Sequence, residues 1–179
     1  MTSASSAPSP VPADSGAALH LYAVALGSNR SLTGRLGPRR ILDAAFAALD
    51  EAPLRLLARS RIIASAPLGP SRRRYANAAA LVAAPLTPLA MLDHLQAIEH
   101  RFGRRRQRRW GARTLDLDLL LWSGGRVRQR RLTIPHPAMA TRAFVLQPLS
   151  KIAPDWRDPS SGRTVRQLAA RLTRAQPAR

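Results

Sequence analysis

An α+β fold, in which helices pack on an antiparallel sheet, is what the sequence predicts. Apolar runs of strand length alternate with segments whose apolar residues recur at helical spacing. Proline, glycine, serine and asparagine separate these segments, as is typical of loops. A length of 179 residues without an internal repeat predicts one domain that is large enough to bury a core.

Six segments in the order β-α-β-β-α-β make up the predicted sandwich. They are a strand at 19–26, a helix at 38–50, strands at 54–65 and 76–84, a helix at 87–103 and a strand at 115–122. Gly27 ends the first strand, and Pro38 suits the first turn of a helix, where its missing N–H would have no partner. Thr87 and Pro88 begin the second helix, which ends near Gly103. This order indicates a ferredoxin-like two-layer sandwich.

The remaining segments are loops and C-terminal additions to the sandwich. Leucine and isoleucine favour the strand at 54–65, whereas the alanines of 76–84 are weaker strand formers. Prolines and arginines predict loops at 67–74 and 104–109. The additions are a hairpin arm at 126–132 behind Gly124-Gly125, an extended segment at 135–137 and a helix at 164–172.

The first 18 residues differ in composition from the rest of the chain. They are rich in alanine, serine and proline, carry only Asp14 as a charged side chain, and lack the features of a secretion signal. We expect a disordered tail at 1–18 and one domain at 19–175. No apolar stretch is long enough to span a bilayer, so a cytoplasmic protein is expected.

The charge balance indicates an anionic partner. The chain has 29 basic and 10 acidic residues, for a formal net charge of +19, and Lys151 is its only lysine. Arginine binds phosphate oxygens through a planar fork, so a nucleotide or a nucleic acid fits this charge. A chain-wide abundance of alanine, arginine and proline explains the global charge equally well, without an anionic partner. Cysteine is absent, which excludes disulfides, thiolate nucleophiles and zinc–thiolate sites.

Two carboxylates interrupt the apolar strand at 115–122. Asp116 and Asp118 are two residues apart, so both side chains point to one face of a strand. Like charges at this spacing favour a cation between them, and Mg²⁺ takes a few carboxylates together with phosphate oxygens and water. The alternative is an ion-pair cluster, in which the acids balance the nearby side chains of Arg104, Arg106, Arg109 and Arg113.

Other candidate residues carry weaker signals. Trp110 could stack on a flat ring or pack in the protein, and Tyr75 and Asn77 share a strand face that could bind a heterocycle. Gln96 and Glu99 share a helix face and could reach a nucleotide, although solvated polarity explains them as well. His136 lies between two prolines and is more typical of a structural histidine. Neither a P-loop nor a nucleophile elbow is present.

The segment Arg109-Trp110-Gly111-Ala112-Arg113-Thr114-Leu115-Asp116-Leu117-Asp118-Leu119-Leu120 closely resembles the signature of the 6-hydroxymethyl-7,8-dihydropterin pyrophosphokinase family of folate biosynthesis. The resemblance covers residues 21–156. Further motifs that carry it are Ala25-Leu26-Gly27-Ser28-Asn29, Ala66-Pro67-Leu68-Gly69-Pro70, Tyr75-Ala76-Asn77-Ala78, Ile98-Glu99, Leu132-Thr133-Ile134-Pro135-His136-Pro137 and Arg142-Ala143-Phe144-Val145-Leu146.

The resemblance implies transfer of pyrophosphate from ATP to the hydroxymethyl group of 6-hydroxymethyl-7,8-dihydropterin, with release of AMP. We expect the chain to act as a monomer. It implies that Asp116 and Asp118 hold two Mg²⁺ ions and that Arg104 and Arg113 follow the migrating phosphoryl groups. The implied ATP site is Gln96, Glu99, Arg106, Arg109, Leu119, Arg131, Leu132, Thr133, His136 and Arg142. The implied pterin site is Ser65, Pro67, Leu68, Tyr75, Asn77, Trp110 and Phe144, with Ser65 standing where threonine is common.

Two other functions are weighed against this enzyme. A ferredoxin-like RNA-binding module would account for the charge, but such modules stack bases on aromatic residues, which are scarce here, and the acid pair would have no role. An inactive relative with a structural role is disfavoured by the intact acids and arginines. We therefore expect neither a nucleic acid nor a membrane as partner.

Overall fold

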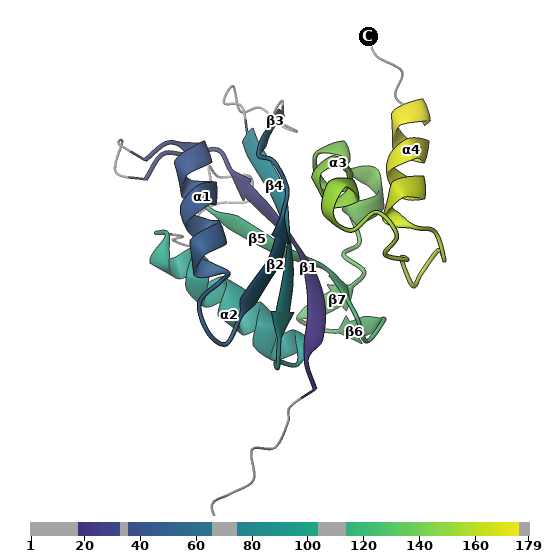
Figure 1. Ribbon diagram of the computed structural model, residues 1–179, viewed down its shortest axis with the longest axis horizontal. Coiled ribbons are helices and arrows are strands. Elements are labelled where there is room, and N and C mark those ends of the chain that lie inside the picture. Colours follow the sequence, from purple (N-terminus) through teal and green to yellow (C-terminus); the bar gives the residue numbers. More distant parts are fainter. Residues whose placement is uncertain (1–17, 33–35, 66–74, 104–113, 176–179) are drawn as a thin grey trace, which may run out of the picture.

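A five-stranded antiparallel sheet forms the centre of the structure, a computed structural model that describes residues 18–32, 36–65, 75–103 and 114–175 (Figure 1). The strand order is β2-β4-β1-β5, and β3 pairs with β4 beyond the end of β2. The strands are β1 (His20–Ser28), β2 (Arg55–Arg59), β3 (Ile63–Ser65), β4 (Tyr75–Ala84) and β5 (Asp116–Trp122). This antiparallel sheet with packed helices confirms the predicted fold class.

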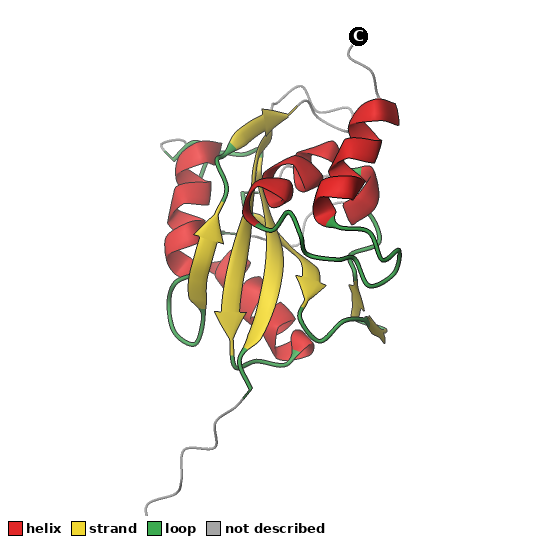
Figure 2. Cartoon of the chain, turned by 45° about the vertical axis from the view of Figure 1, so that its right-hand side comes forward, coloured by secondary structure: helices red, strands yellow, loops and turns green. Residues whose placement is uncertain are grey.

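Four α-helices cover the sheet in the described part of the chain (Figure 2). Helices α1 (Pro38–Ala48) and α2 (Pro88–Arg101) lie on one face, while α3 (Ala143–Ile152) and α4 (Val165–Ala175) lie on the other. A short 3₁₀ helix (Met139–Thr141) precedes α3. The C-terminal additions therefore form a third layer over part of the sheet.

Helices α1 and α2 begin where the sequence predicts. Pro38 opens α1 directly after Gly37, and the hydroxyl of Thr87 accepts a hydrogen bond from the Ala90 N–H at 3.4 Å, which caps α2. The last residue of α2, Arg101, forms an ion pair of 2.7 Å with Glu51. The hydrogen bond that Arg101 donates in this ion pair lowers the pKa of the Glu51 carboxyl. The ion pair also links the end of α2 to the α1–β2 connection.

Strand β1 separates two apolar clusters by its alternation. Val24 and Leu26 face α1 and α2, in a cluster with large side chains such as Ile41 and Leu95. Ala23 and Ala25 face the other way, toward α3 and α4. Strand β1 thus carries large residues on one face and small residues on the other.

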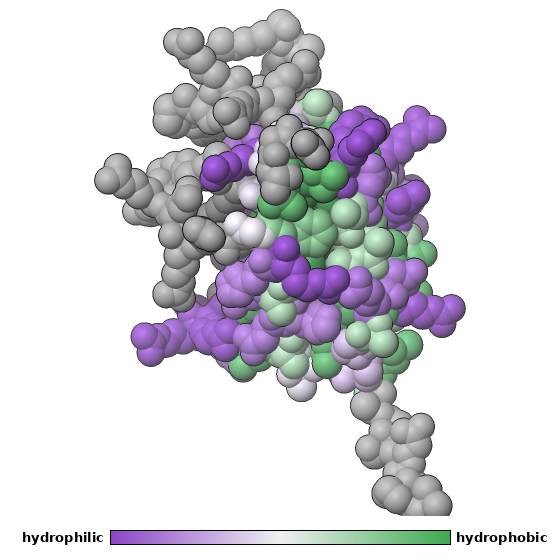
Figure 3. Space-filling view, turned by 90° about the vertical axis from the view of Figure 1, so that its left-hand side faces the viewer, coloured by the Kyte–Doolittle hydropathy of each residue, from purple (hydrophilic) through white to green (hydrophobic). Residues whose placement is uncertain are grey.

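The outward side of α1 and α2 shows hydrophilic side chains beside apolar ones (Figure 3).

The predicted strand at 54–65 is wrong in one respect, because it is two strands. The backbone breaks at Ser60, whose N–H donates to the Ala79 carbonyl and whose hydroxyl accepts from the Ala79 N–H, both at 2.9 Å. These bonds replace regular pairing with β4 at that point. Strand β3 then pairs with the first residues of β4, and Ser65 lies opposite Tyr75.

Two further expectations need correction at the C-terminal end. The predicted arm at 126–132 contains a turn, and the hairpin consists of β6 (Val127–Gln129) and β7 (Leu132–Ile134). Helix α3 was not predicted, because Pro148 lies inside it and proline normally interrupts a helix. The predicted helix at 164–172 is confirmed as α4.

The structure covers most of the predicted domain at 19–175, whereas residues 1–17 of the predicted tail lie outside the described residues. In the described ranges, each helix is too short or too polar to cross a membrane.

Candidate active site

The acid pair lies on the sheet face that α3 covers. Leu117 and Leu119 of β5 are buried in the cluster with α1 and α2, so Asp116 and Asp118 point to the opposite face. Both aspartates are half-buried. A register shift follows Leu119, so Leu120 and Leu121 also face α3 and join its apolar cluster. The two acids thus share one face, as the sequence predicts, and leucines beyond them anchor the helix.

Small residues surround the acid pair on the neighbouring strands. Gly27 of β1 pairs with Asp116 on one side and with Asn77 of β4 on the other. Ala25 likewise pairs with Asp118. Residues directly opposite one another in an antiparallel sheet share a face, so these two rows form one surface. The sheet surface beside the carboxylates therefore lacks long side chains at Ala25 and Gly27, and we call this surface the floor of the site.

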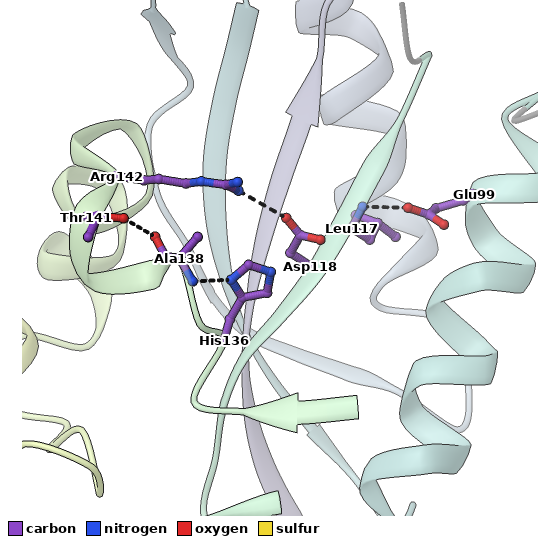
Figure 4. Close-up of polar contacts among 7 residues, drawn as sticks. All are labelled: Glu99, Leu117, Asp118, His136, Ala138, Thr141 and Arg142. Atoms are coloured by element: carbon purple, nitrogen blue, oxygen red, sulfur yellow. Dashed lines mark hydrogen bonds and ion pairs between the residues drawn. The ribbon is translucent and has the colours of Figure 1, made fainter. Parts of the chain in front are cut away.

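Arg142 connects the acid pair to the start of α3 (Figure 4). Its guanidinium Nη1 lies 4.0 Å from Asp118 Oδ2, and its Cζ lies 5.9 Å from the centre of the Phe144 ring. Both charged side chains are about one-third exposed, at 37% and 35%. Arg142 thus places a fixed positive charge between a carboxylate and an aromatic face.

His136 lies on the same side of β5 as Arg142 in Figure 4. Its backbone N–H donates to the Leu120 carbonyl at 3.0 Å, which fixes this segment along the outer edge of β5. Its ring Nδ1 accepts a hydrogen bond from the Ala138 N–H at 3.1 Å. A neutral imidazole that accepts at Nδ1 carries its proton on Nε2. His136 is therefore set to donate from Nε2.

The outer edge of β5 faces the C-terminal half of α2. Glu99 is buried, and its Oε1 accepts a hydrogen bond of 2.8 Å from the Leu117 N–H. Gln96, one turn earlier, is exposed. The Leu119 side chain is buried in the core, so an ATP molecule at this edge would meet its backbone. The implied ATP residues of α2 and β5 are thus brought to one edge.

The β6–β7 hairpin completes that edge with its turn and with β7, because β7 packs against both α2 and β5. Arg131 forms an ion pair of 2.5 Å with Asp93 of α2. Leu132 is buried in the core, and Thr133 is exposed. Among these three residues, Arg131 and Thr133 therefore offer polar side chains to a ligand, whereas Leu132 offers its backbone.

The implied pterin residues lie on the other side of the acid pair. Asn77 is buried, and its Nδ2 donates to the Ser65 hydroxyl at 2.8 Å. Tyr75 is half-buried, pairs with Ser65 across β3 and β4, and shares the strand face of Asn77. Phe144 is half-buried at the start of α3, which also packs against β3 and β4. The amide and the two rings thus flank one region of the sheet.

The donor set of Asp116 and Asp118 fits Mg²⁺. Two half-exposed carboxylates leave coordination positions for phosphate oxygens and water, which is how Mg²⁺ is usually held beside nucleotides. The described residues contain no group of three or more histidine, cysteine and acidic side chains that could enclose a metal by themselves. The chemistry of the site therefore suits a metal that a phosphate substrate helps to bind.

Seven residues that the sequence singles out lie outside the described residues, so their placement stays a prediction. They are Pro67, Leu68, Arg104, Arg106, Arg109, Trp110 and Arg113.

Sequence reasoning missed the glycine and alanine of the floor. Gly27 was interpreted as the end of a strand, yet β1 continues through it to Ser28. The signal was available in the alternation of Ala23, Ala25 and Gly27 with Val24 and Leu26. That pattern puts small residues on one face of a central strand from Ala23 to Gly27.

Comparison with known proteins gives one family. Residues 23–154 match the family described as 7,8-dihydro-6-hydroxymethylpterin-pyrophosphokinase. A 2-amino-4-hydroxy-6-hydroxymethyldihydropteridine pyrophosphokinase of Pseudomonas aeruginosa is 46% identical over 149 residues, which cover 82% of this chain and 88% of that protein. The enzyme of the same name from Synechocystis sp. is 43% identical over 146 residues, covering 79% and 74%.

A solved structure shares the fold at low identity. The Plasmodium falciparum HPPK-DHPS A437G protein with pteroate superposes with a TM-score of 0.69 at 13% identity. The match covers 90% of this chain and 42% of that one, so the chain spans less than half the length of the solved protein. The names of the two sequence relatives and of the family describe the same pyrophosphokinase, and the solved structure has the same fold. The chain belongs to the 7,8-dihydro-6-hydroxymethylpterin-pyrophosphokinase family, whose reaction is pyrophosphate transfer to hydroxymethyldihydropterin in folate biosynthesis.

Proposed function

We propose that the chain performs this transfer with ATP as the donor, releasing AMP, and that it depends on two Mg²⁺ ions held by Asp116 and Asp118. The observation that carries the proposal is the position of these two acids. They lie between the edge of β5, where Glu99 binds the Leu117 N–H and the His136 N–H binds the Leu120 carbonyl, and the strand surface of Asn77. A donor bound at the edge and an acceptor bound on the surface would meet at the carboxylates.

The ATP residues have distinct roles in this proposal. His136 donates from Nε2 to a phosphate oxygen, and Arg142 offers a guanidinium within 4.0 Å of Asp118. Gln96, Glu99, Leu119, Arg131, Leu132 and Thr133 line the rest of the edge, together with Arg106 and Arg109 from the sequence signature. Arg131 would leave or share its contact with Asp93 when ATP binds.

The pterin lies between aromatic faces and an amide in this proposal. Tyr75 and Phe144 flank the ring, and Asn77 reads its polar edge. Pro67, Leu68 and Trp110 would cover the ring, and Ser65 holds the Asn77 amide.

The transfer step itself is an in-line displacement. The hydroxymethyl oxygen of the pterin forms a bond to the β-phosphorus of ATP and releases its proton to water, while the bond from that phosphorus to the α–β bridging oxygen breaks and AMP leaves with that oxygen. Bound Mg²⁺ would neutralise charge on the triphosphate. Arg104, Arg113 and Arg142 supply positive charge where negative charge develops on the oxygens. The fixed side chains of β5 and α3 orient the two substrates for this step.

The test is direct product detection. Purified chain is incubated with ATP, MgCl₂ and 6-hydroxymethyl-7,8-dihydropterin, and AMP and pterin pyrophosphate are separated and quantified. We expect one AMP for each pterin consumed, and loss of both products when EDTA removes Mg²⁺. ADP as the nucleotide product would contradict pyrophosphate transfer, and full activity in EDTA would contradict the metal role. We further propose that the chain acts as a monomer in the cytoplasm. Light scattering tests the oligomeric state, and cell fractionation tests the location.

A further inference from the structure

Gly27 occupies the middle of the row that joins the proposed pterin site to the acid pair. It pairs with Asn77 of β4 on one side and with Asp116 of β5 on the other. All three positions share a sheet face because they are directly opposite one another in antiparallel pairs. The centre of this row therefore has no side chain.

Among the described residues, neither packing nor backbone conformation requires a glycine at this position. A Cβ atom added to Gly27 would lie 3.7 Å from Asn77 Oδ1 and 3.9 Å from Asp116 Cβ among the described residues, which is ordinary van der Waals contact. The left-handed glycines in the described ranges are Gly103, Gly125 and Gly162, whereas Gly27 lies in a regular strand. The fold would thus accept alanine here, so the bare position needs another reason.

The Asn77 amide supplies that reason. Its Nδ2 donates to the Ser65 hydroxyl at 2.8 Å, which directs the amide nitrogen toward β3. Its Oδ1 lies on the side of Gly27 and close to the place where a Cβ would stand. Asn77 as a whole is 4% exposed, so packing as well as the hydrogen bond restricts the orientation of its side chain. A hydrogen-bond acceptor thus faces the space above bare backbone.

We propose that Gly27 is a specificity-determining position, whose bare backbone leaves room for the edge of the pterin ring that Tyr75 and Phe144 flank. This proposal rests on the proposed function of the same site. Carbon atoms in contact are about 3.5–4.0 Å apart, so a methyl group on Gly27 would occupy the space that this edge of the ring needs. The ring would be lifted away from the Asn77 acceptor, and its hydroxymethyl group would be displaced from Asp116. ATP, at the outer edge of β5, would not meet this methyl group.

The test compares three variants, Gly27→Ala, Gly27→Val and Gly37→Ala. Gly37 is a matched control, because a Cβ there meets nothing within 4 Å of the described residues and its φ of −71° accepts alanine. KM and kcat are measured for both substrates, and the melting temperature is measured for each variant. We expect Gly27→Ala to raise KM for the pterin about tenfold or more, the usual effect of one methylene in a shaped pocket, with a larger effect for valine.

In the same experiment, Gly27→Ala should have the same KM for ATP and the same melting temperature as the unsubstituted protein. Gly37→Ala should have the same KM for each substrate as the unsubstituted protein. An unaltered pterin KM in a folded, active Gly27→Ala chain would overturn the inference and leave the proposed function standing. An equal rise in both KM values would also overturn it, because the methyl group would then act on the whole site. If the unchanged chain forms no AMP, the proposed function itself fails.

Discussion

The two faces of the central strand β1 serve opposite purposes. On the side of α1 and α2, Val24 and Leu26 are fully buried among large apolar side chains. On the side of α3, Ala25 and Gly27 lie beside Asp118 and Asp116. Large side chains fill the space between a sheet and its helices, which stabilises the fold. Small side chains leave the opposite face low beside the half-buried carboxylates and the buried Asn77 amide.

The comparison shows how one strand can support stability and function at once. Because successive side chains point to opposite faces, a change at Leu26 should act on stability, and a change one residue away, at Ala25 or Gly27, should act on substrates. Substitutions on each face test whether stability and substrate binding depend on different faces of β1.

Asp118→Asn should have the largest effect. Asparagine keeps the size of the side chain but removes the charge that holds the metal, so kcat should fall by about a thousandfold or more. AMP formation measures the rate, and circular dichroism checks the fold. Asp155→Asn is the matched control, since Asp155 forms an exposed ion pair with Arg166 and its loss should leave the rate unaltered. A rate within about tenfold of normal for Asp118→Asn would argue against the metal role.

Leu26→Ala should have the largest effect on stability. Leu26 is 1% exposed, and its truncation leaves a cavity that typically costs about 3 kcal/mol in the free energy of unfolding. Urea unfolding measures this loss, and kinetics below the transition should give normal KM values. Altered KM values in the folded fraction would show that the two faces are coupled.

Arg142→Ala should have an intermediate effect on catalysis. It removes the guanidinium beside Asp118 and above Phe144, so kcat/KM should fall about 10–100-fold for both substrates. Arg142→Lys keeps the charge without the planar fork and should recover part of the loss. Steady-state kinetics measure both variants. Equal rates for the lysine and alanine variants would exclude a role for the charge.

Ser65→Ala should have the smallest effect of this series. It removes the acceptor for the Asn77 amide, and a hydrogen bond contributes about 1 kcal/mol, so KM for the pterin should rise about fivefold. Ser65→Thr keeps the hydroxyl and should restore the normal KM. Pterin titration in steady-state assays distinguishes the variants. A threonine variant as weak as the alanine variant would mean that shape, rather than the hydrogen bond, matters at this position.

Part of the site could be predicted because its geometry is local. The spacing of Asp116 and Asp118 fixes their common face, and Thr87 with Pro88 fixes the start of α2. The break at Ser60 could not be predicted, because the bonds that cause it come from Ala79 on another strand. Helix α3 was missed for a related reason. Its apolar residues pack on the sheet, and that burial overrides the cost of Pro148.

The sequence by itself determined most of the order of elements up to β5, the shared face of the acid pair and the family signature, since each depends on residues close together in the chain. Only the tertiary structure decided that Arg142 approaches Asp118, that Glu99 binds the edge of β5, and that Gly27 lies between Asn77 and Asp116. These contacts join segments that are distant in the chain. They form when strand pairing and burial on both faces of the sheet are satisfied together, and local pattern does not encode that condition.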